Sequence, residues 1–115
     1  MTLHAALKAL WDALPKEARP EDVWIEDDTD FCFGEGHGKR VLSDDQATAM
    51  LCHAAEGWLS HTLGLILRIS QCSVLDVCVE LQHQLDDTPF AEVSGDTKPA
   101  ALAAAVKAVK EWRAE

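Results

Sequence analysis

The stretch SDDQATAMLCHAAEGWL, residues 43–59, carries the clearest periodic pattern in the chain. Its apolar residues recur at intervals of three and four positions, at Ala47, Met50, Leu51, Ala54, Ala55, Trp58 and Leu59. This is the spacing of one buried face of an α-helix. Ser43 followed by Gln46 is a capping-box pattern. We therefore predict a helix that begins after Ser43 and ends near residues 61–64.

Two other stretches predict helices. Residues 2–14 have a capping Thr2, an apolar stripe at helical spacing and Pro15 as the stop signal. Near the C-terminus, Pro99 lies where the first turn of a helix tolerates proline. The alanine-rich run that follows places Leu102, Val106 and Val109 on one stripe. These patterns predict helices at both ends of the chain.

The remaining regular structure is predicted to be extended. Two β-prone runs, 23–26 and 31–33, flank a polar turn, while the glycine-rich residues 34–39 predict a loop. After the central helix, residues 63–70, 75–82 and 90–94 read as strands. A helix over 74–85 is the alternative, and the β-branched residues there favour a strand.

This order, α-β-β-α-β-β-β-α, predicts an α+β fold with a small, mainly antiparallel sheet packed by two or three helices. At 115 residues, we expect one domain spanning 1–115. The longest strongly apolar run, 63–69, is shorter than the roughly 20 residues of a membrane span. The N-terminus shows no signal-peptide pattern, so a cytoplasmic location is expected.

The charge of the chain restricts the partners it can bind. Twenty acidic residues face ten basic ones, for a formal net charge of −10. Between Val41 and Thr97 the only base is Arg68. Such a chain repels phosphate backbones and anionic lipids, so direct binding of nucleic acid or membranes is disfavoured. The same field attracts basic protein surfaces.

The acidic residues around the first β-prone runs, at the start of the central helix and in the turn over 86–87 are candidates for a partner-binding surface, although solubility is a simpler explanation of their charge. Trp24 is added as a candidate anchor, because tryptophan is enriched at binding hot spots. The complete set of candidates is Glu21, Asp22, Trp24, Glu26, Asp27, Asp28, Asp30, Asp44, Asp45, Asp86 and Asp87.

Cys52, His53 and Glu56 form the one cluster that suggests a metal site, with His37 as an additional ligand. The metalloprotease pattern needs two histidines four residues apart, and this stretch has one. Helical geometry predicts all three side chains on the solvent face. We therefore expect no metal, no cofactor and no catalytic residues, and keep a small metal-binding protein as an alternative. The four cysteines lack a CxxC pair and are expected to be free thiols.

The segment AEVSGDTKPAALAAAVKAV leads from a strand through a polar turn with a proline into an alanine-rich helix. It resembles the C-terminal part of small phage-encoded α/β proteins of the phage ABA-sandwich type. SDDQATAMLCHAAEGW is similar to their earlier helix, and the resemblance covers about half of the chain. It implies a phage or prophage accessory protein without catalytic residues.

Charge and resemblance together predict a non-enzymatic, anti-CRISPR-like protein that binds the basic surface of a host nucleic-acid-binding protein and inhibits it. It would do so by imitating nucleic-acid charge, in the cytoplasm of the host cell. The alternative is a homo-oligomeric structural or assembly module, such as a homodimer, in which the apolar region 63–81 pairs across a two-fold axis.

Overall fold

The computed structural model describes residues 2–27, 30–34, 38–74, 76–85, 89 and 91–114. Its helical elements are α1 (Leu3–Ala13), the 3-10 turn η1 (Lys16–Ala18), α2 (Asp44–Gly57), the π-helical turn η2 (Trp58–Thr62) and α3 (Lys98–Ala114). Its strands are β1 (Val23–Glu26), β2 (Asp30–Gly34), β3 (Lys39–Val41), β4 (Leu65–Gln71), β5 (Val77–His83) and β6 (Ala91–Gly95).

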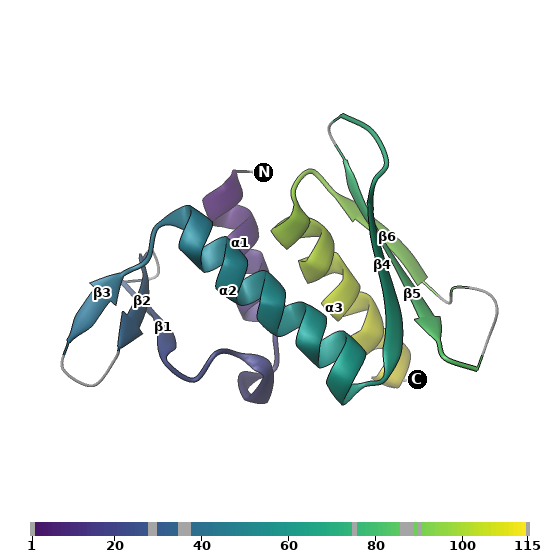
Figure 1. Cartoon of the computed structure of the whole chain (residues 1–115), viewed down its shortest axis with the longest axis horizontal. Coiled ribbons are helices and arrows are strands. Elements are labelled where there is room, and N and C mark those ends of the chain that lie inside the picture. Colours follow the sequence, from purple (N-terminus) through teal and green to yellow (C-terminus); the bar gives the residue numbers. More distant parts are fainter. Residues whose placement is uncertain are drawn as a thin grey trace.

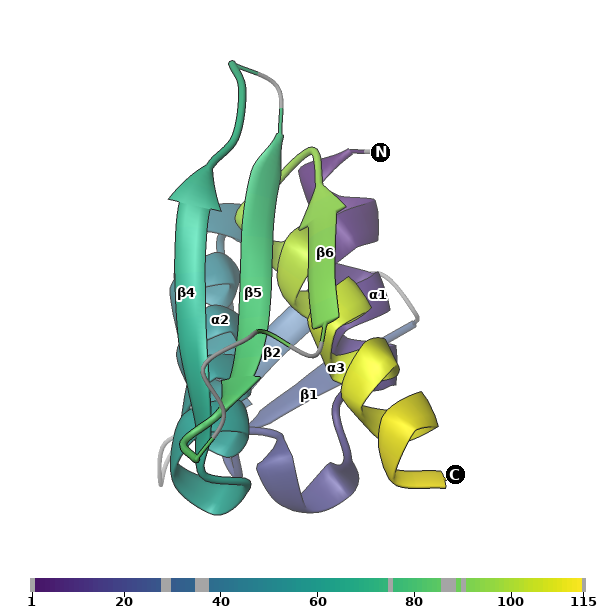
Figure 2. The ribbon, with the colours of Figure 1, turned by 90° about the vertical axis from the view of Figure 1, so that its right-hand side faces the viewer.

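The helices form a central layer between two sheets (Figure 1). The N-terminal sheet has the order β1-β2-β3 and the C-terminal sheet the order β4-β5-β6, with antiparallel pairing throughout. Figure 2 shows the C-terminal sheet in front of α2 and α3. The predicted α+β class and the rough alternation of elements are confirmed. The strands are divided between two sheets, where a single sheet was expected.

β3 is a strand that was not predicted from the sequence. It begins at Lys39, the last residue of the stretch expected to be a loop. Its residues pair with β2 in the register Cys32↔Val41, Phe33↔Arg40 and Gly34↔Lys39. All three residues of β3 are exposed, so the strand has no buried side chain and no clear pattern in the sequence.

The central helical run, α2 continued by η2, has the ends that its sequence predicts, although its last turn is π-helical. The Ser43 hydroxyl accepts a hydrogen bond from the Gln46 N–H at 3.2 Å, and the Ser43 N–H donates to Gln46 Oε1 at 3.1 Å, which completes the capping box. At the other end, the Leu63 N–H donates to the Trp58 carbonyl, and Gly64 has a positive φ of 68°. Glycine adopts this conformation without strain, so the chain can turn there into β4.

One hydrophobic core joins the three helices to both sheets. The predicted stripes of α1 and α3 supply its centre, with Leu7, Leu10, Leu102 and Val106 fully buried. The C-terminal sheet contributes Leu65, Val79 and Leu81, and the N-terminal sheet contributes Val23 and Phe31.

Residues 77–83 form a strand, so the choice between strand and helix in this region is resolved. Val79 and Leu81 on the inner face are fully buried against the helices. On the outer face, Glu80 lies opposite Arg68 of β4 and Glu92 of β6. The alternation of apolar and polar residues is the pattern of a sheet with one buried face.

The expectation of four free thiols is wrong for one pair, because Cys72 and Cys78 form a disulfide. Antiparallel pairing of β4 with β5 brings their Cα atoms to 5.8 Å, within the usual range for a disulfide. Cys32 and Cys52 are free and buried. The spacing of six residues does not reveal this pair, since only the hairpin places the two cysteines side by side.

Across the described residues, the longest helices are too short or too polar to cross a bilayer.

Candidate functional site

The predicted acidic residues of the N-terminal sheet lie at its edges and turns. Glu21 and Asp22 are exposed in the turn before β1, and Asp30 is exposed at the start of β2. Asp27 is also exposed and has a positive φ of 52°. Within the described part of the chain, no ion pair engages Glu21 or Asp22. Asp28 lies outside the described residues.

Glu26 differs from these acids because its negative charge is neutralised by Lys39 of the same chain. Lys39 Nζ lies 2.7 Å from Glu26 Oε2, and the Trp24 indole N–H donates to Glu26 Oε1 at 3.3 Å. The hydrogen bond from Lys39, followed by that from Trp24, lowers the pKa of Glu26 below its ordinary value. Glu26 therefore adds little net charge to a partner-binding surface.

Trp24 is half-buried and covers part of the outer face of the N-terminal sheet. Its six-membered ring lies against Gly34 on the neighbouring strand. Cys32 pairs with Trp24 on the same face and is fully buried. The remaining exposed part of the indole is available to a partner, but much of the side chain serves the sheet.

The acids of α2 lie apart from those before β1. Asp44 and Asp45 are exposed in the first turn of α2, where they suit the positive end of the helix dipole. Asp44 Oδ1 also lies 3.7 Å from His4 Nδ1. In Figure 1 the start of α2 is at the upper left, and the segment before β1 is at the lower left. Asp86 and Asp87 lie outside the described residues.

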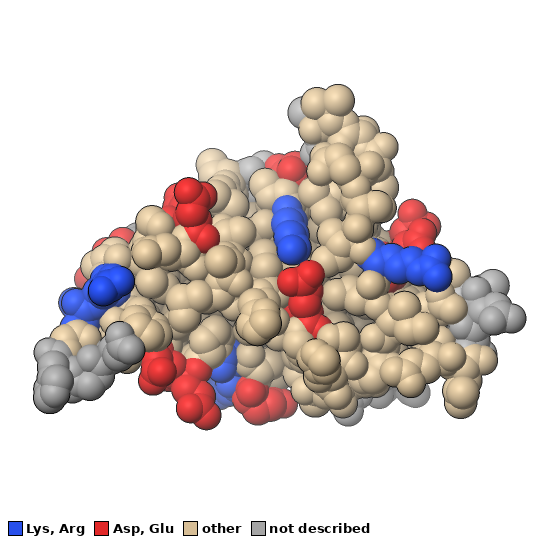
Figure 3. Space-filling view, viewed as in Figure 1, with Lys and Arg blue, Asp and Glu red and all other residues tan. Residues whose placement is uncertain are grey.

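Figure 3 shows the acidic side chains of one face as separate clusters, with uncharged surface between them. Basic side chains lie beside some of these clusters. Lys98 and Glu56 form an ion pair, with 3.5 Å between Nζ and Oε1. On this face the acids therefore form dispersed groups, and a partner would have to contact them at several points.

Cys52, His53 and Glu56 do not share one solvent-facing surface, so that prediction is wrong for Cys52. Cys52 is only 3% exposed, Glu56 is half-buried and His53 is exposed. Burial raises the pKa of the Cys52 thiol to about 11, which keeps it protonated near neutral pH. Cys52 is buried because α3 packs against this part of α2, where Lys98 lies beside Glu56.

No group of three or more metal-ligating side chains is gathered anywhere among the described residues. His37, the additional ligand suggested by the sequence, lies outside them. His53 instead lines a hollow of about 340 Å³ between η1 and the end of α2, together with Glu17 and Trp58.

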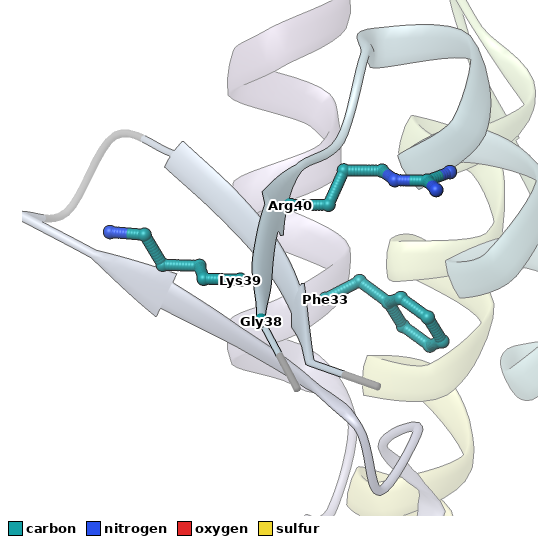
Figure 4. A pocket seen from close by; sticks show the side chains of 4 residues that line it. All are labelled: Phe33, Gly38, Lys39 and Arg40. Carbon is teal, nitrogen blue, oxygen red and sulfur yellow. The ribbon is translucent and has the colours of Figure 1, made fainter. Parts of the chain in front are cut away.

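A second hollow, on the N-terminal sheet, was missed from the sequence. A cavity of about 240 Å³ is lined by Phe33, Gly38, Lys39 and Arg40 (Figure 4). A neighbouring cavity of about 300 Å³ shares Phe33 and Arg40 and is completed by Leu42, Gln46, Ala49 and Met50. We call these two cavities the β3 groove. No sequence pattern indicated it, because residues 34–39 were expected to form a loop and all three residues of β3 are exposed.

Comparison of the chain with protein-family models, curated proteins and solved structures gives no match.

Proposed function

We propose that this chain is a non-enzymatic accessory protein of the phage type, which binds the basic surface of a host nucleic-acid-binding protein and inhibits it. The observation that carries the proposal is the net charge of −10. A field of this sign steers basic partners to the protein and repels nucleic acid. The phage origin and the host cytoplasm as the place of action come from the sequence resemblance alone.

The positions of the acids support a contact made at several points. Glu21, Asp22, Asp27 and Asp30 are exposed around the N-terminal sheet, and Asp45 is exposed at the start of α2. Carboxylates distributed in this way can meet lysine and arginine side chains that normally contact successive phosphates. A CRISPR effector is one example of such a partner.

The proposal is tested by a pull-down with the immobilised protein from nuclease-treated bacterial lysate. Nuclease removes partners that are bridged by nucleic acid. We expect basic nucleic-acid-binding proteins to be recovered at about 0.1 M salt and lost at about 1 M, because the Debye length falls from roughly 10 Å to roughly 3 Å. Recovery of no such protein at low salt would contradict the proposal.

Two matched double variants distinguish the effect of a local acidic surface on partner binding from the effect of the net charge. Glu21→Gln with Asp22→Asn removes two charges before β1. Glu92→Gln with Glu111→Gln removes two exposed charges elsewhere. We expect the first pair to weaken recovery of the partner and the second pair to leave it nearly unchanged. An equal loss of partner recovery by both double variants would mean that binding depends on the net charge and not on a defined surface. Inhibition is then measured as release of the partner's labelled nucleic acid by the wild-type protein.

A homodimer is the second candidate, and the arrangement of β4 favours it. This seven-residue strand is an edge of the C-terminal sheet and, among the described strands, pairs only with β5. Its apolar residues Leu65, Leu67 and Ile69 lie on the face that packs on the helices. A dimer would therefore join the backbone edges of two β4 strands. Light scattering at high concentration tests this, and a strict monomer would rule it out.

A further inference from the structure

The β3 groove lies beside an open strand edge. Among the described strands, β3 pairs with β2 on one side only. Its N–H and C=O groups on the other side are directed away from the sheet. Figure 1 shows β3 as the outermost strand of the N-terminal sheet. An open edge of this kind is the template to which an extended peptide can add as a further strand.

The larger of the two cavities of the β3 groove has an apolar floor. Phe33, Leu42 and Met50 are half-buried, so each exposes part of its side chain into the groove, while Gln46 and Ala49 form its outer rim on α2. A cavity of about 300 Å³ is at the lower end of the size range of ligand sites and has room for one or two side chains. The flexible methionine side chain lets this surface adapt to different apolar groups.

The Arg40 side chain places a positive charge beside this apolar floor. Arg40 is the cross-strand neighbour of Phe33, and both side chains project to the same side of the hairpin (Figure 4). Arg40 is exposed, and within the described residues no carboxylate forms an ion pair with it. Lys39 projects to the opposite side, where it bonds to Glu26. Figure 3 shows basic side chains at the left end of the molecule, with acidic side chains near them.

We propose that the β3 groove binds an extended segment of another protein that combines a carboxylate with an apolar side chain. The segment adds to the free edge of β3. Its carboxylate meets the Arg40 guanidinium, which offers paired N–H donors. Because the side chains of a strand alternate, the apolar residue two positions away lies on the same face and over Leu42 and Met50.

A nucleic acid is the less favourable occupant of the β3 groove. It would bring one negative charge per nucleotide towards a chain with a net charge of −10. Against that charge, the described residues of the groove offer one cation without an ion pair, Arg40. A peptide with one or two carboxylates meets that cation with less repulsion and also supplies the backbone that pairs with β3. The site is independent of the acidic surfaces discussed above, because it attracts ligands of the opposite charge.

The test uses a display library of random peptides of about seven residues, the length of an ordinary strand. Selection on the whole protein is expected to enrich sequences with an acid and an apolar residue two positions apart. The best peptide is then synthesised with its acid intact and with that acid replaced by the corresponding amide. Binding is measured by fluorescence anisotropy, and protection of the β3 amides by hydrogen exchange.

Arg40→Gln removes the charge, and Ala49→Phe fills the groove from an exposed helix position. Each is expected to weaken binding by about tenfold or more. The matched controls are Arg68→Gln on β4 and Ala5→Phe on α1, both at exposed positions outside the groove, and both should bind within about twofold of wild type. Circular dichroism verifies that all four variants are folded.

Four results would overturn the proposal. They are a library without acidic-apolar enrichment, equal binding of the amide peptide, equal binding by Arg40→Gln, and absence of protection at β3. An oligothymidylate probe is included as a separate arm. If it binds more tightly than the peptide and depends on Arg40, the occupant is a nucleic acid and the peptide proposal fails.

Discussion

Trp24 covers Gly34 so closely that a methyl group added to Gly34 would lie 2.9 Å from Cη2 and Cζ3 of the indole ring. The two residues are on neighbouring strands and on the same face of the N-terminal sheet. The same indole donates its N–H to Glu26, which Lys39 binds in turn. The outer face of this sheet is thus held by an aromatic ring and an ion pair.

Gly34→Ala should displace the Trp24 ring. Because the ring is half-buried and can swing outwards, we expect a moderate decrease in the free energy of unfolding, about 1 kcal/mol. Tryptophan emission should shift to longer wavelength as the ring enters water, and the shift should be absent when Trp24 is already phenylalanine. Gly38→Ala is the control, since among the described residues no atom beyond its sequence neighbours lies within 4 Å of the added Cβ.

Gly95→Ala should be more damaging, because the obstacle is backbone. The new Cβ would lie 2.6 Å from the Ala101 nitrogen and 2.8 Å from the Ala100 carbonyl carbon. β6 and the first turn of α3 would have to separate, at a cost of about 3 kcal/mol in urea unfolding. Gly57→Ala, at an open position in α2, should instead stabilise by about 0.5–1 kcal/mol. Equal effects of the two changes would contradict this packing.

Ser43→Ala should lower the free energy of unfolding by about 1 kcal/mol, because the Gln46 N–H loses its acceptor. Ser43→Gly should cost only a few tenths of a kcal/mol, since glycine is tolerated at this position. Chemical denaturation measures both. If alanine were no worse than glycine, the hydroxyl would not be capping α2.

The stability of the protein should fall at alkaline pH through Cys52. An unfolded thiol has a pKa of about 8.5, whereas burial raises that of Cys52 to about 11. The folded state therefore favours the protonated thiol. Its contribution is complete below the unfolded pKa and is lost as the pH rises towards the folded pKa. Unfolding of wild type and Cys52→Ala at pH 7 and pH 10 measures this, and the gap between the two proteins should narrow at pH 10.

Two thiols, and not four, should react with an alkylating reagent in denaturant without a reductant. These are Cys32 and Cys52, which the folded protein shields by burial. After reduction, Cys72 and Cys78 should react as well. Mass spectrometry of the tryptic peptides counts and locates the labels. Labelling of all four cysteines before reduction would show that the disulfide is not formed.

The sequence by itself determined the elements whose information is local. Ser43 and Gln46 mark the start of α2, Pro15 follows the end of α1, and the alternation around Val79 and Leu81 defines β5. In each case the deciding contacts lie within about one helix or hairpin, so the periodicity of apolar residues and the capping residues are sufficient.

Only the tertiary structure decided how these elements meet. The division of the six described strands between two sheets depends on which strand edges pair, and no local pattern records that choice. Helical geometry alone predicts that Cys52 faces solvent, but α3 packs against its side of α2 and buries it. Phe33, Arg40 and Met50 come from three elements, and they line one groove only because β3 pairs with β2 beside α2. The reason is physical: burial and neighbourhood are set by contacts between residues that are distant in sequence, and local patterns carry no record of those contacts.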